Sequence, residues 1–155
     1  IDQVATLATF GAVWAVLAVG HNLADHVIGQ TDTQAGNKGA PSAAEIADGV
    51  SPREGWAACL RHVAQYHLVM AVFMGLAWAV LPLQMSWSGL AAGLIVSVVT
   101  HAFFDRRWPV RWLLEHIGSK GFAELKAAGM NGMYLTDQAL HQTALLVSAL
   151  LITVL

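Results

Sequence analysis

The chain has 155 residues, of which 56% are hydrophobic and 12% charged, and its formal net charge is −2. A soluble globular domain has about 25% charged residues, so this composition argues against an ordinary soluble domain. The slightly negative charge argues against a general nucleic-acid-binding protein, and the single cysteine, Cys59, excludes a disulfide within the chain.

The charge deficit is concentrated in long stretches with few or no Asp, Glu, Lys or Arg residues. A membrane-spanning helix needs about 20 mainly apolar residues. We therefore predict membrane spans at residues 3–28, 57–82, 86–105 and 135–155. Four spans form one bundle around one core. The predicted fold class is all-α: a polytopic membrane protein whose single domain, residues 1–155, is a four-transmembrane-helix bundle.

The first stretch is expected to be a membrane span and not a cleaved signal peptide. Its apolar run ends in His21-Asn-Leu-Ala-Asp25 instead of a small-residue cleavage site. The 29–56 loop that follows is rich in Gly and Pro. We expect irregular structure there, with one short helix near 43–48.

The 106–134 loop has a different character. A proline favours a helix over 109–115, and 122–128 has a weak helical pattern. Trp108 and Trp112 are amphipathic aromatic residues of the kind that lie at a membrane interface. We therefore predict an interfacial helical segment in this third loop.

The orientation follows from the distribution of Lys and Arg. The 106–134 loop holds most of these residues, and an excess of Lys and Arg marks the cytoplasmic side. We predict a multi-pass protein of the bacterial inner membrane, with both long loops cytoplasmic and both termini outside.

Histidine and aspartate residues gather at the same end of all four predicted spans. Three His/Asp pairs have the spacing i, i+4, which places both side chains on one helical face. Imidazole and carboxylate groups are good ligands for zinc and related divalent ions. We predict a site for one or two divalent ions, zinc first among them. The predicted ligands are His21, Asp25, His62, His101, Asp105, Asp137 and His141. The alternative is a structural hydrogen-bonded network without metal.

Other histidines are expected to lie outside this cluster. His26 is offset from His21 by about 140° around the helix. His67 is offset from His62 by the same angle. His116 belongs to the basic loop and is expected on the surface.

Arg61, Arg106 and Arg107 are expected to contact lipid phosphates. A sharper hypothesis makes Arg61 a phosphate clamp next to the metal, because a guanidinium group matches phosphate bidentately. The predicted substrate-binding residues are Arg61, Tyr66, Gln138 and Gln30.

The leading functional hypothesis is a membrane-embedded, metal-dependent hydrolase of zinc type. It would act on a lipid or amphipathic substrate at the cytoplasmic interface, with a phosphoester favoured. One of Asp25, Asp105 and Asp137 would act as general base toward a water activated by the metal.

A non-catalytic metal-binding membrane protein is the alternative: a sensor, a transporter or an accessory subunit. The outer halves of the spans, such as 5–17 and 70–81, are almost wholly apolar and argue against a channel. The expected partners are membrane lipids and the substrate, and a homo-oligomer or a larger membrane complex stays open.

Short motifs in all four spans resemble a family of small bacterial membrane proteins catalogued as domain of unknown function 3307. The motifs are His21-Asn-Leu-Ala-Asp25 followed by Gln30 and Lys38, His62-Val-Ala-Gln-Tyr66, Thr100-His101 through Asp105, and Leu135-Thr-Asp137-Gln138-Ala-Leu-His141. Two departures are His26, where the family often has an aromatic residue, and the long 29–56 loop. The resemblance implies no established activity.

Overall fold

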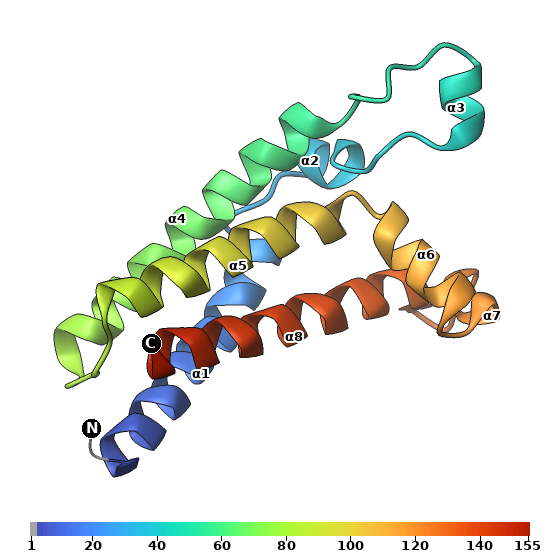
Figure 1. The fold of residues 1–155 in the computed structure, drawn as a ribbon. Coiled ribbons are helices and arrows are strands. Elements are labelled where there is room, and N and C mark those ends of the chain that lie inside the picture. Colours follow the sequence, from blue (N-terminus) through green and yellow to red (C-terminus); the bar gives the residue numbers. More distant parts are fainter. Residues whose placement is uncertain (1–2) are drawn as a thin grey trace.

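The computed structural model describes residues 3–155, and it is all-helical apart from one small β-hairpin. Its long helices are α1 (Gln3–His26), α4 (Trp56–Val80), α5 (Trp87–Asp105) and α8 (Gly132–Val154). They follow the four predicted spans to within a few residues, because each predicted span is a long stretch with few breaks in its apolar pattern. The all-α fold class is confirmed (Figure 1).

Three of these helices have the properties of membrane spans. Within the described residues, α1, α4 and α5 are long and apolar enough to cross a membrane. The first turns of α8 carry Asp137, Gln138 and His141, and this helix is not among the three. Three apolar helices indicate a membrane protein, and the fourth span stays a prediction.

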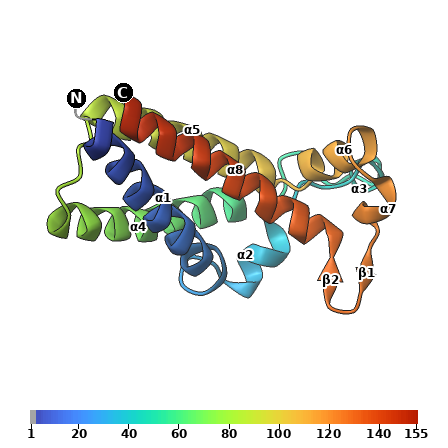
Figure 2. The ribbon, with the colours of Figure 1, turned by 90° about the horizontal axis from the view of Figure 1, so that it is seen from below.

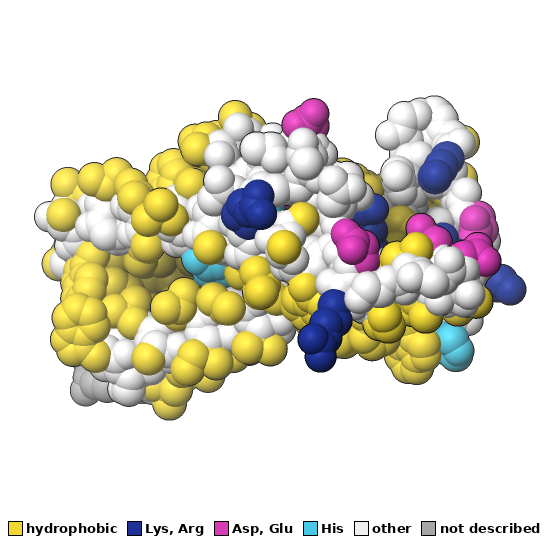
Figure 3. All heavy atoms as spheres, turned by 90° about the horizontal axis from the view of Figure 1, so that it is seen from above, with side chains coloured by type: hydrophobic (Ala, Val, Ile, Leu, Met, Phe, Trp, Pro, Cys, Tyr) yellow, Lys and Arg dark blue, Asp and Glu magenta, His cyan; other side chains and the backbone are white. Residues whose placement is uncertain are grey.

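Charged and apolar surfaces lie at opposite ends of the molecule. Figure 3 shows hydrophobic side chains covering the half formed by the C-terminal end of α4 and the N-terminal end of α5. The charged side chains gather on the other half, where the long loops fold. The loops therefore form a polar end on an apolar bundle.

The closest helix pair is α5 with α8, which lie side by side in both Figure 1 and Figure 2. A Cβ atom added at Gly89 would lie 2.7 Å from the backbone oxygen of Ile152. A Cβ atom at Gly93 would lie 2.5 Å from the Ile152 side chain. Glycine at these two positions thus permits the close approach of the two helices.

The 29–56 loop contains more helix than predicted. The expected short helix is confirmed as α3 (Ala43–Ala47), but α2 (Asp32–Asn37) was not predicted. Both helices begin with a capping box, in which a Ser or Thr side chain and a Gln or Glu three residues later bond each other's backbone N–H groups. In α2 these residues are Thr31 and Gln34. The capping boxes stabilise short helices in a segment rich in Gly and Pro.

The 106–134 loop forms α6 (Trp108–His116), α7 (Lys120–Ala123), β1 (Lys126–Ala127) and β2 (Met130–Asn131). The predicted helix at 109–115 is confirmed as α6. The helical pattern predicted over 122–128 holds for the first two residues, which belong to α7, and is wrong for the rest. Ala128 and Gly129 have φ angles of 51° and 79°, and two successive positive φ angles turn β1 back onto β2 as a hairpin.

Arg106 connects the two loops, and its predicted contact with lipid phosphate is wrong. Its side chain is buried. It donates hydrogen bonds to the backbone oxygens of Lys38, at 2.9 Å, and Glu54, at 2.6 Å. Its guanidinium also lies 4.6 Å from the centroid of the Trp56 ring. Arg106 therefore fixes the 29–56 loop against the end of α5.

Candidate metal centre

Five buried His and Asp side chains meet at the polar end of the long helices. They are Asp25 from α1, His62 from α4, His101 and Asp105 from α5, and His141 from α8, and each is at most 2% exposed. The convergence expected from the sequence is thus present for these five residues.

Two groups of three potential ligands occur within the described residues. Asp25, His62 and His101 form one group, and His101, Asp105 and His141 form the other. In each group the ligand atoms all lie within 4.8 Å of one another. The groups share His101 and are parts of one cluster that could hold a metal ion.

The Nε2 atoms of His62 and His101 lie close to each other and to one oxygen of each of two carboxylates. His62 Nε2 lies 3.0 Å from Asp25 Oδ1 and 3.1 Å from His101 Nε2. Asp105 Oδ2 lies 3.4 Å from His62 Nε2 and 3.3 Å from His101 Nε2. His101 Nε2 lies 3.8 Å from Asp25 Oδ1. Ligands at about 2.0–2.1 Å from a tetrahedral zinc ion are separated by about 3.3–3.4 Å. The five distances from the two imidazole nitrogens lie near this value.

The hydrogen bonds of His62 direct a lone pair into the cluster. Its Nδ1 lies 3.0 Å from the backbone oxygen of Gly29, and a carbonyl oxygen only accepts, so Nδ1 carries the hydrogen. In the neutral ring, Nε2 then presents its lone pair to the carboxylate oxygens around it. This arrangement is repulsive unless a cation or an added proton lies between them. Metal-binding histidines characteristically donate their other N–H group in this way.

The His141 ring, like that of His62, is held by a hydrogen bond from Nδ1 to a backbone oxygen. Its Nδ1 donates to the backbone oxygen of Asp137 at 2.8 Å. Its buried Nε2 has no hydrogen-bond partner among the residues that the structure describes, and it lies 4.0 Å from Asp105 Oδ1. A buried polar atom without a partner is costly. The His141 nitrogen is therefore a potential ligand atom at the cluster.

His21 lies beside the cluster with both of its nitrogens engaged. Its Nδ1 is 3.0 Å from the Tyr66 hydroxyl, and its Nε2 is 3.0 Å from Gln138 Oε1. Its ring also stacks on His141 at a centroid distance of 5.6 Å. Two of the predicted substrate-binding residues, Tyr66 and Gln138, thus hold this imidazole in place.

The remaining predicted residues lie at different distances from the cluster. Asp137 is partly exposed, with Oδ2 at 3.6 Å from His141 Nδ1. Gln138 also donates to Asp25 Oδ2 at 3.0 Å, and Gln30 donates to the Asp25 backbone oxygen at 2.7 Å. Arg61 is exposed on α4 and does not line the pocket described next.

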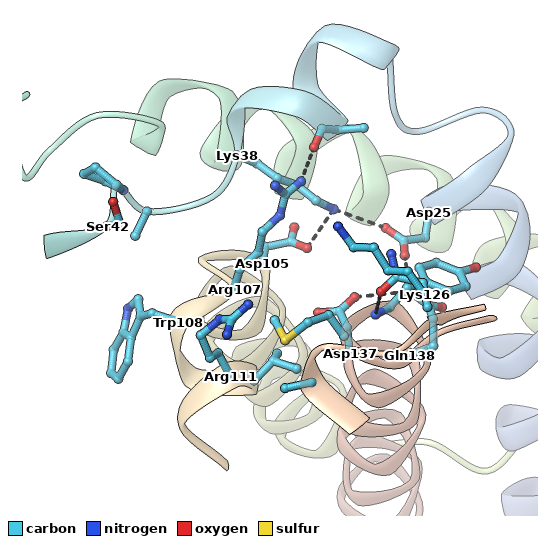
Figure 4. Close-up of a pocket in the computed structure, with 18 of the residues that line it drawn as sticks. Asp25, Lys38, Ser42, Asp105, Arg107, Trp108, Arg111, Lys126, Asp137 and Gln138 are labelled. Atoms are coloured by element: carbon cyan, nitrogen blue, oxygen red, sulfur yellow. Dashed lines mark hydrogen bonds and ion pairs between the residues drawn. The ribbon is translucent and has the colours of Figure 1, made fainter. Parts of the chain in front are cut away.

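A pocket of about 670 Å³ opens onto the cluster from the polar end. Asp25, Asp105 and Asp137 line it, and Figure 4 shows Arg107, Trp108 and Arg111, from α6 and its N-terminal junction, on the side away from Asp25 and Gln138, with Asp105 next to Arg107. Gln30, Lys38, Lys126, Tyr134 and Gln138 also line it. The carboxylates of the cluster thus face a cavity with both acidic and basic walls.

The two arginines that line the pocket, Arg107 and Arg111, differ in whether a carboxylate compensates their charge. Arg111 pairs with Glu124 at 2.7 Å and with Glu115 at 3.3 Å. The hydrogen bond from Arg111 lowers the pKa of Glu124, so this pair keeps its charges at neutral pH. Arg107 instead donates to the neutral backbone oxygen of Ala35. The positive charge of Arg107 is therefore the better placed one to meet an anion in the pocket.

Lys38 reaches the cluster, which the sequence did not predict. Its Nζ lies 2.7 Å from Asp105 Oδ1 and 3.8 Å from Asp25 Oδ1, and Figure 4 shows both ion pairs. The sequence places Lys38 only in the motif that resembles domain of unknown function 3307, without a role at the site. No spacing relates it to the helices, because the contacts of Arg106 with the loop position it.

The other three histidines lie at the edge of the cluster or away from it. His26 is exposed and contacts the Tyr134 hydroxyl at 2.7 Å, but its Nε2 also lies 3.9 Å from Asp25 Oδ2, and it lines the same pocket. His67 contacts Ser97 Oγ at 3.0 Å, and His116 is exposed, as expected. That the three lie outside the ligand set stays a prediction.

Fold and site together define a helical protein with three apolar helices of membrane-spanning length and a buried His/Asp cluster that could bind a metal ion. No family model matches the chain, and searches of curated proteins and of solved structures gave no significant match.

Proposed function

We propose that the chain is a membrane-embedded, metal-dependent hydrolase of the bacterial inner membrane. The observation that carries this proposal is the buried His/Asp cluster beside a pocket with basic walls. Purely structural polar networks have no need of an open cavity next to their carboxylates. The four-span arrangement, with the pocket facing the cytoplasm, is part of the same proposal.

The residues of the cluster divide into ligands and a base. His62, His101, Asp25 and Asp105 are the proposed ligands, and His141 is held ready beside them. A divalent ion, with zinc favoured, supplies positive charge and lowers the pKa of a water from 15.7 to about 7. Asp137 lines the pocket and is partly exposed. Of the three candidate bases, Asp137 is the most exposed, and it would be the one to take up a proton from a water in the pocket.

The proposed substrate is a lipid or amphipathic phosphoester. Arg107 has no carboxylate partner among its described hydrogen bonds, and a guanidinium matches phosphate well. Trp108 is exposed at the rim of the pocket, where it suits a membrane interface. These features favour Arg107 over the sequence-based choice of Arg61 as the phosphate-contacting arginine.

The test is hydrolysis by protein purified in detergent and reconstituted in vesicles. The substrates are phosphatidate, a lipid diphosphate and a soluble aryl phosphate, with carboxylic ester and amide lipids for comparison. We expect phosphoester hydrolysis that a chelator abolishes and zinc restores. Asp137→Asn should lower kcat while leaving metal content unchanged. Protein that retains metal but hydrolyses none of these substrates would overturn the enzyme proposal.

A non-catalytic metal-binding role is the second candidate. The buried ligand groups carry this candidate too, because a site that could hold a cation serves sensing or transport without any catalytic step. Zinc flux or retention by vesicles without hydrolysis would support this role. The resemblance to domain of unknown function 3307 also stays a prediction, and it favours neither role.

A further inference from the structure

Lys38 is held at the cluster by several independent contacts. Its side chain is largely buried, with 8% of the residue exposed. Its backbone oxygen accepts a hydrogen bond from Arg106, and two residues later Ala40 N–H donates to the Arg106 backbone oxygen at 3.0 Å. Gln34 of α2 also contacts Gln65 of α4. The loop therefore delivers this ammonium group to a fixed place.

Burial of an ammonium group is costly unless a partner of opposite charge compensates it. Lys38 Nζ has such partners in Asp105 Oδ1, at 2.7 Å, and Asp25 Oδ1, at 3.8 Å. The Lys38 ammonium group thereby occupies the Oδ1 side of the Asp105 carboxylate. The other oxygen, Oδ2, faces the imidazoles of His62 and His101. One carboxylate thus presents one oxygen to a lysine and the other to the proposed ligand set.

The charges of the cluster limit how many ions it can hold. With neutral imidazoles, the carboxylates of Asp25, Asp105 and Asp137 together with the Lys38 ammonium leave two negative charges. One divalent ion neutralises them. A second would leave two uncompensated positive charges in a buried site, which is strongly unfavourable. If the charge of Asp137 is left out, a second ion would leave three uncompensated positive charges and would be disfavoured further.

We propose that Lys38 is a built-in replacement for a second metal ion, so that the centre binds a single divalent ion. Paired metal sites hold their ions about 3.5–4 Å apart and share carboxylates between them. The oxygen through which Asp105 would join a second ion is the one that Lys38 occupies. This inference rests on the proposed metal centre and assigns its stoichiometry and the role of Lys38.

The experiment counts zinc ions per chain in detergent-purified protein titrated with zinc chloride, by native mass spectrometry and by elemental analysis after gel filtration. We expect one ion in the wild type and one in Lys38→Arg, which keeps the positive charge. We expect two in Lys38→Met, which keeps most of the length of the side chain but removes its charge. Asp105 Oδ1 is then open, and the excess positive charge of a two-ion site falls from two to one. The matched control is Lys126→Met, because Lys126 lines the same pocket but is exposed. This variant should bind one ion.

The possible results distinguish a failure of the proposed role of Lys38 from a failure of the metal centre itself. Two ions in the wild type, or any count other than two in folded Lys38→Met, would overturn the role of Lys38 while leaving a metal centre in place. If Lys38→Met does not fold, the wild-type count and Lys38→Arg still decide: one ion in each supports the proposal, and two in either contradict it. No bound zinc in any variant would refute the metal centre itself.

Discussion

At the scale of single residues, the hydrogen bonds of the imidazoles distinguish the proposed ligands from the groups that would support them. His62 and His141 each donate Nδ1–H to a backbone oxygen and direct Nε2 into the cluster. His21 uses both nitrogens for Tyr66 and Gln138. His21 therefore acts best as a neighbour that orients the ligands, although its spacing from Asp25 predicted a ligand.

The replacement His21→Ala tests this distinction. Loss of a neighbour that orients the ligands weakens metal affinity by about 10–100-fold, whereas loss of a ligand should cost more. We expect His21→Ala to bind zinc in this weakened range and His62→Ala to bind much more weakly. Competition with a chromogenic chelator measures both. Equal losses in the two variants would place His21 among the ligands.

The spacing i, i+4 was informative because it depends only on helix geometry. It placed His101 and Asp105 on one face of a helix, and the structure has them together at 3.3 Å. Lys38 could not be found in this way. Its position depends on how Arg106 binds the 29–56 loop, and such contacts between distant segments leave no periodic pattern in the sequence.

At the scale of the elements, the contact between α5 and α8 sets the position of His101 and Asp105 relative to His141. The uncharged stretches were sufficient to predict both helices, since apolar length alone defines them. Their pairing depends on Gly89 and Gly93, which lie against Ile152. The hairpin of β1 and β2 was missed because a two-residue strand carries too little pattern to distinguish it from helix.

The replacement Gly89→Ala tests this contact. The added Cβ would lie 2.7 Å from the Ile152 backbone oxygen, and overpacking of this kind costs about 1–3 kcal/mol. We expect a lower thermal unfolding temperature in detergent. The control is Gly75→Ala in α4, where nothing lies within 4 Å of the new Cβ. Alanine favours helix by about 1 kcal/mol over glycine, so the control should be unchanged or more stable. Equal behaviour of the two variants would contradict the close packing.

At the scale of the whole molecule, the polar end carries the cluster, the pocket and both long loops, and the opposite end is apolar. The proposed topology rests on this polarity and on the Lys and Arg residues of the 106–134 loop, because an apolar surface suits the membrane and an excess of Lys and Arg marks the cytoplasmic side. It requires residues 29–56 and 106–134 to lie on the same side. The sequence predicted this arrangement from the distribution of Lys and Arg.

Cysteine labelling tests the topology. Ala47 in α3 and Ser119 before α7 are exposed, whereas the native Cys59 is buried. In cells and in inverted vesicles, we expect cysteines at these two positions to react with a membrane-impermeant maleimide from the cytoplasmic side only. Labelling of both from outside would reverse the orientation. Labelling from opposite sides would contradict the four-span bundle.

The most direct test of the metal centre is elemental analysis of the wild-type protein beside His101→Ala, both purified in detergent without chelators. His101 belongs to both groups of potential ligands, so its removal should affect any ion in the cluster. We predict about one divalent ion per wild-type chain, with zinc foremost, and little or none in a folded His101→Ala protein. A wild-type protein without metal, or a His101→Ala protein that keeps its full content, would contradict the assignment of this cluster as a metal centre.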